Sequence, residues 1–290
     1  MIDELGAHVS SAGGVQNAPE RARLVDSVVL QLFSKMASRW AEPEITEATA
    51  AAFRQSCADH GIVFTAAHDS YLINLATADP VLFERSFHSF VGELKRSALL
   101  GLDAVVTHPG NATDGNFARA VRANAEAVQR ALDIVPGETM VLFETTAGAG
   151  TALGASFEQL AELLHIIDAT HAERMGVCVD TCHIWAAGYD LRDQYVQVMQ
   201  QLDEIIGLKR VRLFHLNDSA GGLASRRDRH AHIGDGFLGG SAFARLLQDS
   251  RLMSVPKVIE TPKDEDVVAA DRRNLARLRE LRRANKYEFA

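Results

Sequence analysis

The chain has 290 residues, of which 47% are hydrophobic and 23% are charged, and its formal net charge at pH 7 is −8. This composition is typical of a globular protein that can bury one large core or two smaller ones. The excess of acids argues against a general basic binder of nucleic acid, unless bound cations neutralise some of the carboxylates. No apolar run is long enough to span a membrane.

The N-terminus and the cysteines both indicate an intracellular protein. Residues 1–11 lack the basic region and apolar stretch of a signal peptide, so we expect a cytoplasmic location. The three cysteines, Cys57, Cys178 and Cys182, form neither a disulfide framework nor a C-x-x-C pair. Reduced thiols are therefore expected, and a zinc site made of thiolates is not.

Eight short apolar runs with strand-forming residues recur along the chain. They are residues 5–10, the weakest of the eight, and 28–33, 62–68, 104–110, 140–146, 175–181, 211–218 and 257–262. Continuous apolar runs of this length are typical of strands that are buried on both faces of a parallel sheet.

Helix-forming segments separate these runs. Residues 117–135 and 156–171 carry apolar side chains at steps of three and four, and Ser156 is placed to cap the second segment. One strand, one helix and two connections recur roughly every 36 residues, and eight such units predict a (β/α)8 TIM barrel. Because no linker rich in Pro, Gly or Ser divides the chain, we expect residues 1–290 to form one domain.

Two further segments differ in character. The basic stretch 272–283 places Leu275, Leu278 and Leu281 on one face, which predicts the last outer helix of the barrel rather than a phosphate-binding surface. The longest connection, 218–240, is polar and rich in glycine, which indicates an active-site loop.

Polar side chains end nearly every predicted strand. In a (β/α)8 barrel these ends open on the same face, which is where such enzymes carry out chemistry. The strand-end candidates and those of the long loop are His8, His68, His108, Glu144, Asp180 with His183, His215, Glu260, Asp228, His230 and His232.

Single candidates also have purely structural interpretations. His215 could cap its strand, His108 could be held by the turn at residues 109–110, and Glu260 could pair with Lys263. The case for chemistry is collective, because so many imidazoles and carboxylates at one mouth repel each other unless cations lie between them. Nitrogen and carboxylate ligands without thiolate suit zinc, manganese or iron better than calcium or magnesium.

Asp180 and His183 stand three positions apart, and by themselves they could be metal ligands, an acid–base pair or a hydrogen-bonded pair that closes a loop. With the other candidates they exceed the roughly four ligands of one tetrahedral zinc ion and suit two or three ions with a bridging carboxylate. Such a site would be cationic and would attract phosphate. The candidate ligands are His68, His108, Glu144, Asp180, His183, His215, Asp228, His230 and Glu260.

A series of motifs gives these candidates a family context. "GAHVSSAGG", "HDSYLIN", "THPGN", "FETTAGAGT", "CVDTCHIWAAGYD", "HLNDS", "SRRDRHAHIGDG" and "ETPK" follow one another between residues 5 and 263. In order and content they resemble endonuclease IV, the apurinic/apyrimidinic endonuclease family of base-excision repair.

The resemblance implies a (β/α)8 barrel with about three zinc ions, with manganese or iron possible in some sites. It implies abasic or otherwise damaged double-stranded DNA as the substrate, cut 5′ to the abasic site to leave a 3′-hydroxyl. It implies neither a membrane nor an obligate protein partner, so a monomer is expected.

The resemblance also assigns ligand sets. Glu144 bridges the first two ions and, as the catalytic carboxylate, would orient the attacking water. The three sets are His68, His108 and Glu144; Glu144, Asp180, His215 and Glu260; and His183, Asp228 and His230.

The DNA-binding loops depart from the family's pattern at one stretch. The family's Phe-Thr-Lys-Asn-x-Arg-x-Trp is "FSKMASRW" at residues 33–40, so Ser38 takes the place of the arginine that enters DNA. Arg39 follows it, and we expect Arg39 to cover part of that role. Tyr71 and Leu72 stand where the family has DNA-facing residues.

A second stretch departs from the pattern beside the predicted bridging carboxylate. The family's Glu-Asn-Thr-Ala-Gly-Gln-Gly is "ETTAGAG" at residues 144–150, so Thr145 replaces asparagine and Ala149 replaces glutamine. All nine ligand positions keep the expected residue types, so the changes fall on the surface that would face DNA.

Two other functions compete with this one. A metal-dependent sugar isomerase or epimerase of the xylose isomerase-like kind uses the same barrel, but it needs fewer ligands and has no use for the set of His183, Asp228 and His230. A zinc-buffering or scaffold protein would tolerate loss of the ligand order, whereas here the ligands end consecutive predicted strands.

Overall fold

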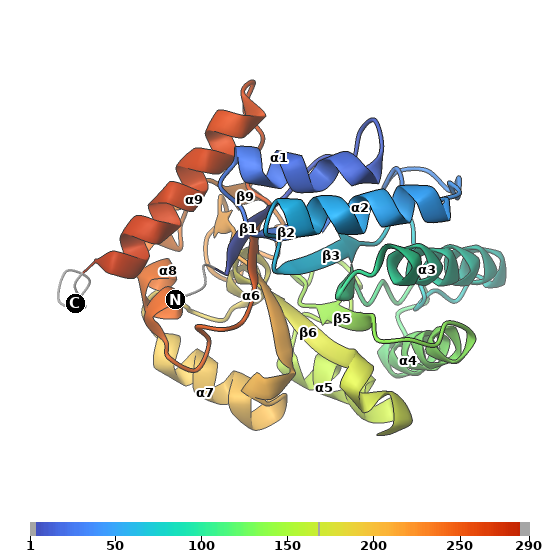
Figure 1. Cartoon of the computed structure of the whole chain (residues 1–290). Helices are drawn as coiled ribbons and strands as arrows, with labels where there is room; N and C mark the ends of the chain where they lie inside the picture. Colours follow the sequence, from blue (N-terminus) through green and yellow to red (C-terminus); the bar gives the residue numbers. More distant parts are fainter. Residues whose placement is uncertain (1–3, 168, 285–290) are drawn as a thin grey trace.

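The computed structural model describes residues 4–167 and 169–284. Parallel strands close into a barrel in the order β1-β10-β7-β6-β5-β4-β3-β2, with helices around them (Figure 1). These strands are β1 Leu5–His8, β2 Val29–Leu32, β3 Phe64–His68, β4 Ala104–Thr107, β5 Met140–Glu144, β6 Met175–Asp180, β7 Val211–His215 and β10 Lys257–Ile259. Each lies within one of the predicted runs, so the predicted TIM barrel is confirmed.

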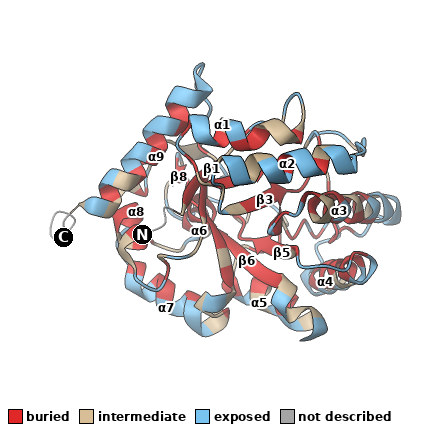
Figure 2. Cartoon of the chain, in the orientation of Figure 1, coloured by how far each residue is buried: buried red, intermediate tan, exposed pale blue. Residues whose placement is uncertain are grey.

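An outer layer of helices covers the strands, and Figure 2 shows their exposed outward faces around a buried sheet. Its members are α1 Ala18–Leu24, α2 Glu47–Asp59, α3 Pro80–Leu100, α4 Phe117–Ile134, α5 Phe157–Ile166, α7 Tyr195–Ile205, α8 Gly239–Gln248 and α9 Val267–Arg283. The short helix α6, Thr181–Ala187, instead follows β6 directly, and 3₁₀ turns lie at η1 Val15–Asn17, η2 Ala169–Arg174 and η3 Leu208–Arg210. No helix of the described residues has the length and apolar character to cross a membrane.

The predicted helices are confirmed with one correction. Ser156 caps α5 as expected, since its side chain accepts the N–H of Gln159. The helix predicted over residues 156–171 is too long, because α5 ends at Ile166 and a 3₁₀ turn begins at Ala169; residue 168 lies outside the described residues. Ile167 has an extended backbone (φ −72°, ψ 132°) and is buried. The helix thus ends at an extended residue whose side chain joins the apolar core, which periodicity alone does not reveal.

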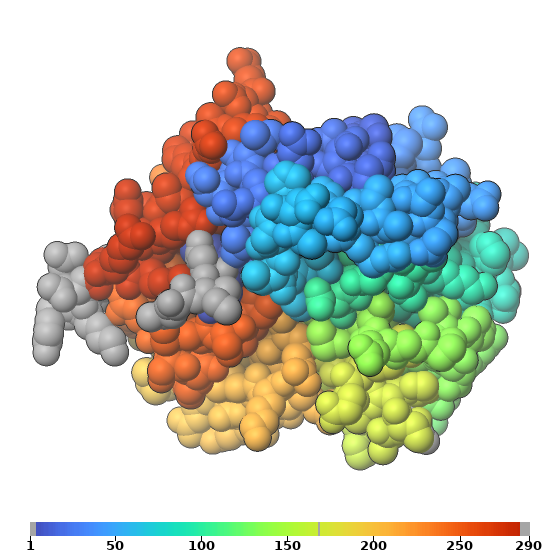
Figure 3. Space-filling model, viewed as in Figure 1, coloured from blue at the N-terminus to red at the C-terminus, as the bar shows by residue number. Residues whose placement is uncertain are grey.

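The first and last strands of the barrel, β1 and β10, pair with each other and close it, with Gly6 opposite Val258. Figure 3 shows the last helix, α9, lying against the first segments of the chain. The guanidinium of Arg279 donates to the carbonyl oxygen of Asp26 at 2.6 Å. The predicted apolar face of α9 is confirmed, because its three leucines, Leu275, Leu278 and Leu281, are buried.

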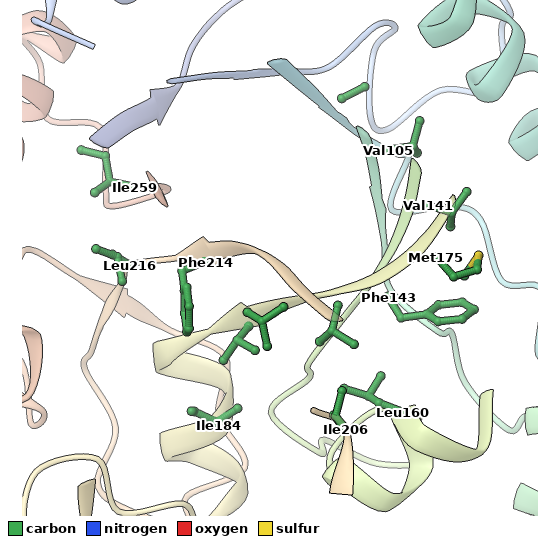
Figure 4. Close-up of a cluster of buried hydrophobic side chains, with 14 of the residues drawn as sticks. Val105, Val141, Phe143, Leu160, Met175, Ile184, Ile206, Phe214, Leu216 and Ile259 are labelled. Carbon is green, nitrogen blue, oxygen red and sulfur yellow. The ribbon is translucent and has the colours of Figure 1, made fainter. Parts of the chain in front are cut away.

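Side chains of the strands alternate between the barrel interior and the helix layer. In Figure 4, Val141 and Phe143 of β5 and Met175 of β6 lie on the helix side, and they share one apolar cluster with Leu160 of α5. The interior holds a separate, smaller cluster of Val29, Ala66, Ala104, Val106, Leu142, Cys178, Leu213 and Val258. The barrel interior is therefore a packed core rather than a pore, and only its mouth is free for polar groups.

Candidate metal centre

The alternation of the strands decides which polar side chains reach the mouth of the barrel. Leu142 is an interior residue, so Glu144, two positions later, faces the same way. In the same way His215 follows Leu213 and Asp180 follows Cys178. The other members of this inward-facing register are His8, Gln31, His68, His108 and Glu260.

Glu144 lies at the centre of this group and is fully buried. Its Oε2 lies 3.1 Å from His68 Nε2 and 2.9 Å from His108 Nε2. Its Oε1 lies 2.8 Å from His215 Nδ1 and 3.4 Å from His183 Nδ1. The two oxygens of one carboxylate thus face different sets of imidazoles, which is the geometry of a bridging ligand.

A second set gathers around His215. Its Nδ1 lies 3.2 Å from Glu260 Oε2 and 4.0 Å from Asp180 Oδ2, besides its approach to Glu144. Ligand atoms of Glu144, Asp180, His215 and Glu260 all lie within 4.8 Å of one another. Three carboxylates and one imidazole in so small a volume need positive charge between them.

The third set combines a helix and the long loop. His183 Nε2 and His230 Nε2 lie 3.2 Å and 3.3 Å from the same oxygen of Asp228. His183 lies in the first turn of α6, whereas the other two come from the loop, in which β8 (Asp218–Ser219) pairs with β9 (His230–Ala231). The sets that the resemblance assigned are therefore the sets that the fold brings together.

Asp180 joins the second and third sets. Its Oδ1 accepts the backbone N–H of His183 at 2.9 Å, so it caps α6. Its Oδ2 faces the mouth and accepts a hydrogen bond from Asn217 Nδ2 at 2.7 Å. The spacing of three between Asp180 and His183 is thus a helix cap that also directs both side chains into the site.

Electrostatics within the mouth are strongly coupled. Burial alone raises the pKa of Glu144, but the imidazoles of His215 and His108 outweigh it and hold that pKa well below its usual range. Burial lowers the pKa of His68, yet Glu144 outweighs it and raises the pKa to about 10. Burial also opposes charge on His183, where Asp180 and Asp228 raise the pKa well above its usual value.

Two buried nitrogen atoms without hydrogen-bond partners indicate whether these residues fit metal ions. His183 Nε2 and His230 Nε2 have no hydrogen-bond partner within the described part of the chain, although both face Asp228. A buried polar atom without a partner is costly, and a cation between the two imidazoles and the carboxylate would satisfy all three. The donor set therefore fits a metal with nitrogen and oxygen ligands.

The cysteines near the mouth do not change this conclusion. Sγ of Cys178 lies close to Glu144 and His215, and Sγ of Cys182 lies close to Asp180 and His230. Burial raises the pKa of both thiols to about 12. In the metal-free protein both thiols are therefore protonated near neutral pH, and the three sets have their nitrogen and oxygen donors without them.

Some candidates lie beside the cluster rather than in it. His8 Nδ1 approaches Glu260 Oε1 at 3.2 Å and so supports a candidate ligand from outside. The ring of His232 pairs with Asp264 and Asn274, away from the mouth. The alternative pairing of Glu260 with Lys263 is wrong, since Lys263 Nζ donates to Asp271 at 2.6 Å.

Three supporting residues were not anticipated from the sequence: Gln31, Asn217 and Asp218. Asn217 Oδ1 accepts the N–H of Glu260 at 2.8 Å while its amide group holds Asp180, so one side chain fixes two strand ends. The register of β2 marks Gln31 as inward-facing, which is a signal that the sequence offered. The carboxylate of Asp218 accepts the backbone N–H groups of Ser219, Gly234, Gly236, Leu238 and Gly239.

The loops around the mouth carry the predicted DNA-facing residues. Tyr71 is 67% exposed, and its ring packs edge-on against Phe33 with centroids 5.4 Å apart. Leu72 is half-buried, whereas Arg39 and its neighbour Ser38 are exposed. Ser70 Oγ donates to the carbonyl oxygen of Ala37 at 2.5 Å, which ties the two loops together.

The two substitutions after Glu144 have different surroundings. Thr145 Oγ1 accepts the N–H of Asp180 at 2.9 Å, and its carbonyl oxygen lies 2.8 Å from His183 Nδ1. Thr145 is therefore part of the support of the cluster rather than of the outer surface. Ala149 lines a small pocket of about 180 Å³ beside His108 and His183.

Comparisons with known proteins agree with this geometry. Residues 27–281 match the family described as xylose isomerase-like TIM barrel. The chain is 48% identical to "Probable endonuclease 4" of Chloroflexus aurantiacus, over 97% of this chain and 98% of that protein. It superimposes on endonuclease IV from Thermus thermophilus with a TM-score of 0.85 and 36% identity, covering 96% and 98% of the two chains.

More distant structures share the barrel alone. The structure of 3-keto-D-glucoside 4-epimerase from E. coli matches with a TM-score of 0.66 and 12% identity, over 96% of this chain and all of that one. At this identity the likeness concerns the fold and carries no information about the reaction.

Proposed function

Since this chain belongs to the endonuclease IV family, the apurinic/apyrimidinic endonucleases of base-excision repair, we propose that it hydrolyses the phosphodiester 5′ to an abasic site with metal ions held by the three side-chain sets. The product would carry a 3′-hydroxyl. We further propose zinc as the metal, because the sets combine imidazoles with carboxylates and contain no thiolate. Manganese or iron could occupy some of the sites.

One observation carries this proposal: the two oxygens of buried Glu144 face two different sets. Such a carboxylate can hold two cations a short distance apart, and paired cations are typical of enzymes that cleave phosphodiesters. When bound, the ions would supply the positive charge that draws phosphate, activates water and offsets the charge that develops on the phosphoryl oxygens.

The chain's own residues position the attacking water and the ligands for that chemistry. Glu144, as the proposed catalytic carboxylate, orients the attacking water from the centre of the mouth. The capped geometry of Asp180 and the support of Asn217 keep the second set rigid before substrate arrives. A rigid cluster needs little reorganisation during the reaction, which lowers its barrier.

Loops around the mouth would hold the DNA. The ring of exposed Tyr71 lies 5.9 Å from that of His68, and half-buried Leu72 follows it in the chain. These two side chains can stack against or wedge between bases. Arg39 offers a guanidinium for a phosphate or for the opened stack. Because the net charge of the chain is −8, binding should depend on this rim and on the bound cations. We propose abasic or damaged double-stranded DNA as the substrate of a monomer without an obligate protein partner.

The decisive experiment uses a duplex with a single abasic site and a labelled strand. The zinc-loaded protein should cut it once, 5′ to the site, and should release a fragment whose 3′ end a DNA polymerase extends directly. Exhaustive chelation should stop the reaction, and added zinc should restore it. An intact abasic duplex, together with epimerisation of a ketose, would overturn the proposal in favour of a sugar-converting enzyme.

A further inference from the structure

Gln31 lies on the inner face of β2, two positions after the interior residue Val29, and its side chain is fully buried. Below the mouth, the barrel interior is the apolar cluster that includes Val29. A buried amide needs hydrogen-bond partners for both its oxygen and its NH₂ group, so the partners of Gln31 indicate what it does.

The amide of Gln31 connects two candidate ligands of the second set. Its Oε1 lies 2.8 Å from His215 Nε2, and its Nε2 lies 2.7 Å from Glu260 Oε1. The same Nε2 lies 3.0 Å from His8 Nδ1. One side chain on β2 therefore contacts ligands that end β7 and β10.

The chemistry of these partners fixes the direction of each hydrogen bond. An ionised carboxylate only accepts, so the NH₂ group of Gln31 must face Glu260 and its oxygen must face His215. An amide oxygen also only accepts, so His215 must carry a hydrogen on Nε2. Nδ1 of His215 is then the nitrogen that is left to face the cluster, where Glu144 Oε1 lies at 2.8 Å and Glu260 Oε2 at 3.2 Å.

We propose that Gln31 is a positioning residue for the second metal site: it fixes the form of His215 that offers Nδ1, and it orients Glu260 toward the same ion. This inference rests on the proposed metal-dependent function. A neighbouring group that orients ligands typically changes metal affinity about 10- to 100-fold when it is removed. Gln31 should therefore govern retention of one ion while touching neither DNA nor the ion itself.

Gln31→Met tests this, because methionine keeps the length of the side chain and offers no comparable hydrogen bond. Metal-free protein would be titrated with zinc against a chromophoric chelator, and ions per chain would be counted by elemental analysis. One ion should bind about 10- to 100-fold more weakly than in the unaltered protein, and the other ions should bind as before. Thr65→Val is the matched control: it removes a buried hydroxyl from β3 that bonds Asp103, and it should leave every ion in place.

Nitrogen-15 NMR of histidine in the unaltered, zinc-loaded protein gives a second readout that needs no variant. The ring proton of His215 should reside on Nε2, protected from exchange by Gln31. A ring proton on Nδ1, or a Gln31→Met variant that binds every ion as tightly as the unaltered protein, would overturn the role of Gln31 alone. If the unaltered protein binds at most one zinc ion, the proposed cluster itself fails and the positioning role fails with it.

Discussion

The strand-borne and loop-borne parts of the candidate site are built in different ways. His68, Glu144 and His215 end strands of the closed barrel and are between 0% and 4% exposed. Asp228 and His230 come from the long loop, where the side chain of Asp228 is 50% exposed and that of His230 is 17% exposed. The first group inherits its direction from the alternation of the strands, whereas the second depends on how the loop folds.

Asp218 explains how a glycine-rich loop can still hold two ligands. Its buried carboxylate gathers the backbone N–H groups of five loop residues, so the loop is wound around one side chain. Gly236 lies so close to that carboxylate that a Cβ would stand 2.4 Å from Asp218 Oδ1. The sheet thus holds the strand-borne part in place, whereas the buried carboxylate of Asp218 holds the loop-borne part in place.

Glu144→Gln should break the strand-borne part and have the largest effect. The amide keeps the shape but loses the negative charge that both neighbouring sets share, so cleavage of the abasic duplex should fall about a thousandfold or more. Glu93→Gln is the control, because Glu93 is equally buried but pairs with Arg96 on α3. If the Glu144→Gln enzyme keeps most of its rate of cleavage, a residue other than Glu144 has the bridging role.

His183→Ala and Asp228→Asn should affect metal binding by the third set without affecting the other two sets. Each removes one of only three ligands, so each variant should lose about one zinc ion per chain by elemental analysis. For Asp228→Asn the melting temperature of the metal-free protein should stay within a few degrees of the original, since the Asp228 side chain is 50% exposed and the barrel beneath is untouched. His215→Ala should instead lower it, because Glu144 and Glu260 would lose a shared, buried partner. Equal losses of stability in all three variants would contradict the division into two parts.

The free energy of unfolding of the metal-free protein should depend on pH through the strand-borne part of the site. The pKa of His68 is raised to about 10, mainly by Glu144 acting against burial, from a value of 6.5 in the unfolded chain. Protonated His68 therefore stabilises the fold fully below pH 6.5, and this stabilisation is lost as the pH rises toward about 10. Urea unfolding of chelated protein should show a free energy of unfolding that falls over this range.

The zinc-loaded protein should lack that decline, because ions take the place of the protons. His68→Asn should flatten the curve of the chelated protein, whereas His88→Asn, which alters an exposed imidazole on α3, should not. A decline of the same size in the metal-free and the zinc-loaded protein would show that the strand-borne part does not exchange protons for metal.

Arg39→Ala should give the smallest effect, since it touches neither part of the cluster. The DNA concentration for half-maximal rate should rise a few-fold, and the dependence of binding on salt should weaken by about one phosphate contact. Zinc content should not change. Ser38→Arg is the complementary variant and should tighten binding to intact duplex more than to single-stranded abasic DNA, because opening a stacked duplex costs a few kcal/mol. If both variants bind DNA as the unaltered protein does, this loop is not part of the DNA-binding surface.

The sequence by itself determined the elements and the direction of most polar groups. Alternation of side chains is a local property of a strand, so the eight runs, the candidate ligands at their ends and the nitrogen and carboxylate chemistry could all be predicted before the fold was known. The interpretation of residues 1–290 as one domain, and the roles of the candidate ligands, stay predictions.

Only the tertiary structure decided which distant residues share a set. Closure of the barrel brings His68 within 3.1 Å of Glu144, which is 76 positions away in the chain. The support from Gln31, Asn217 and Asp218 depends on contacts across strands and around the long loop, which no local pattern encodes. The early end of α5 is also a tertiary feature, because the extended Ile167 is buried in the core at a point where the helical periodicity of the sequence continues.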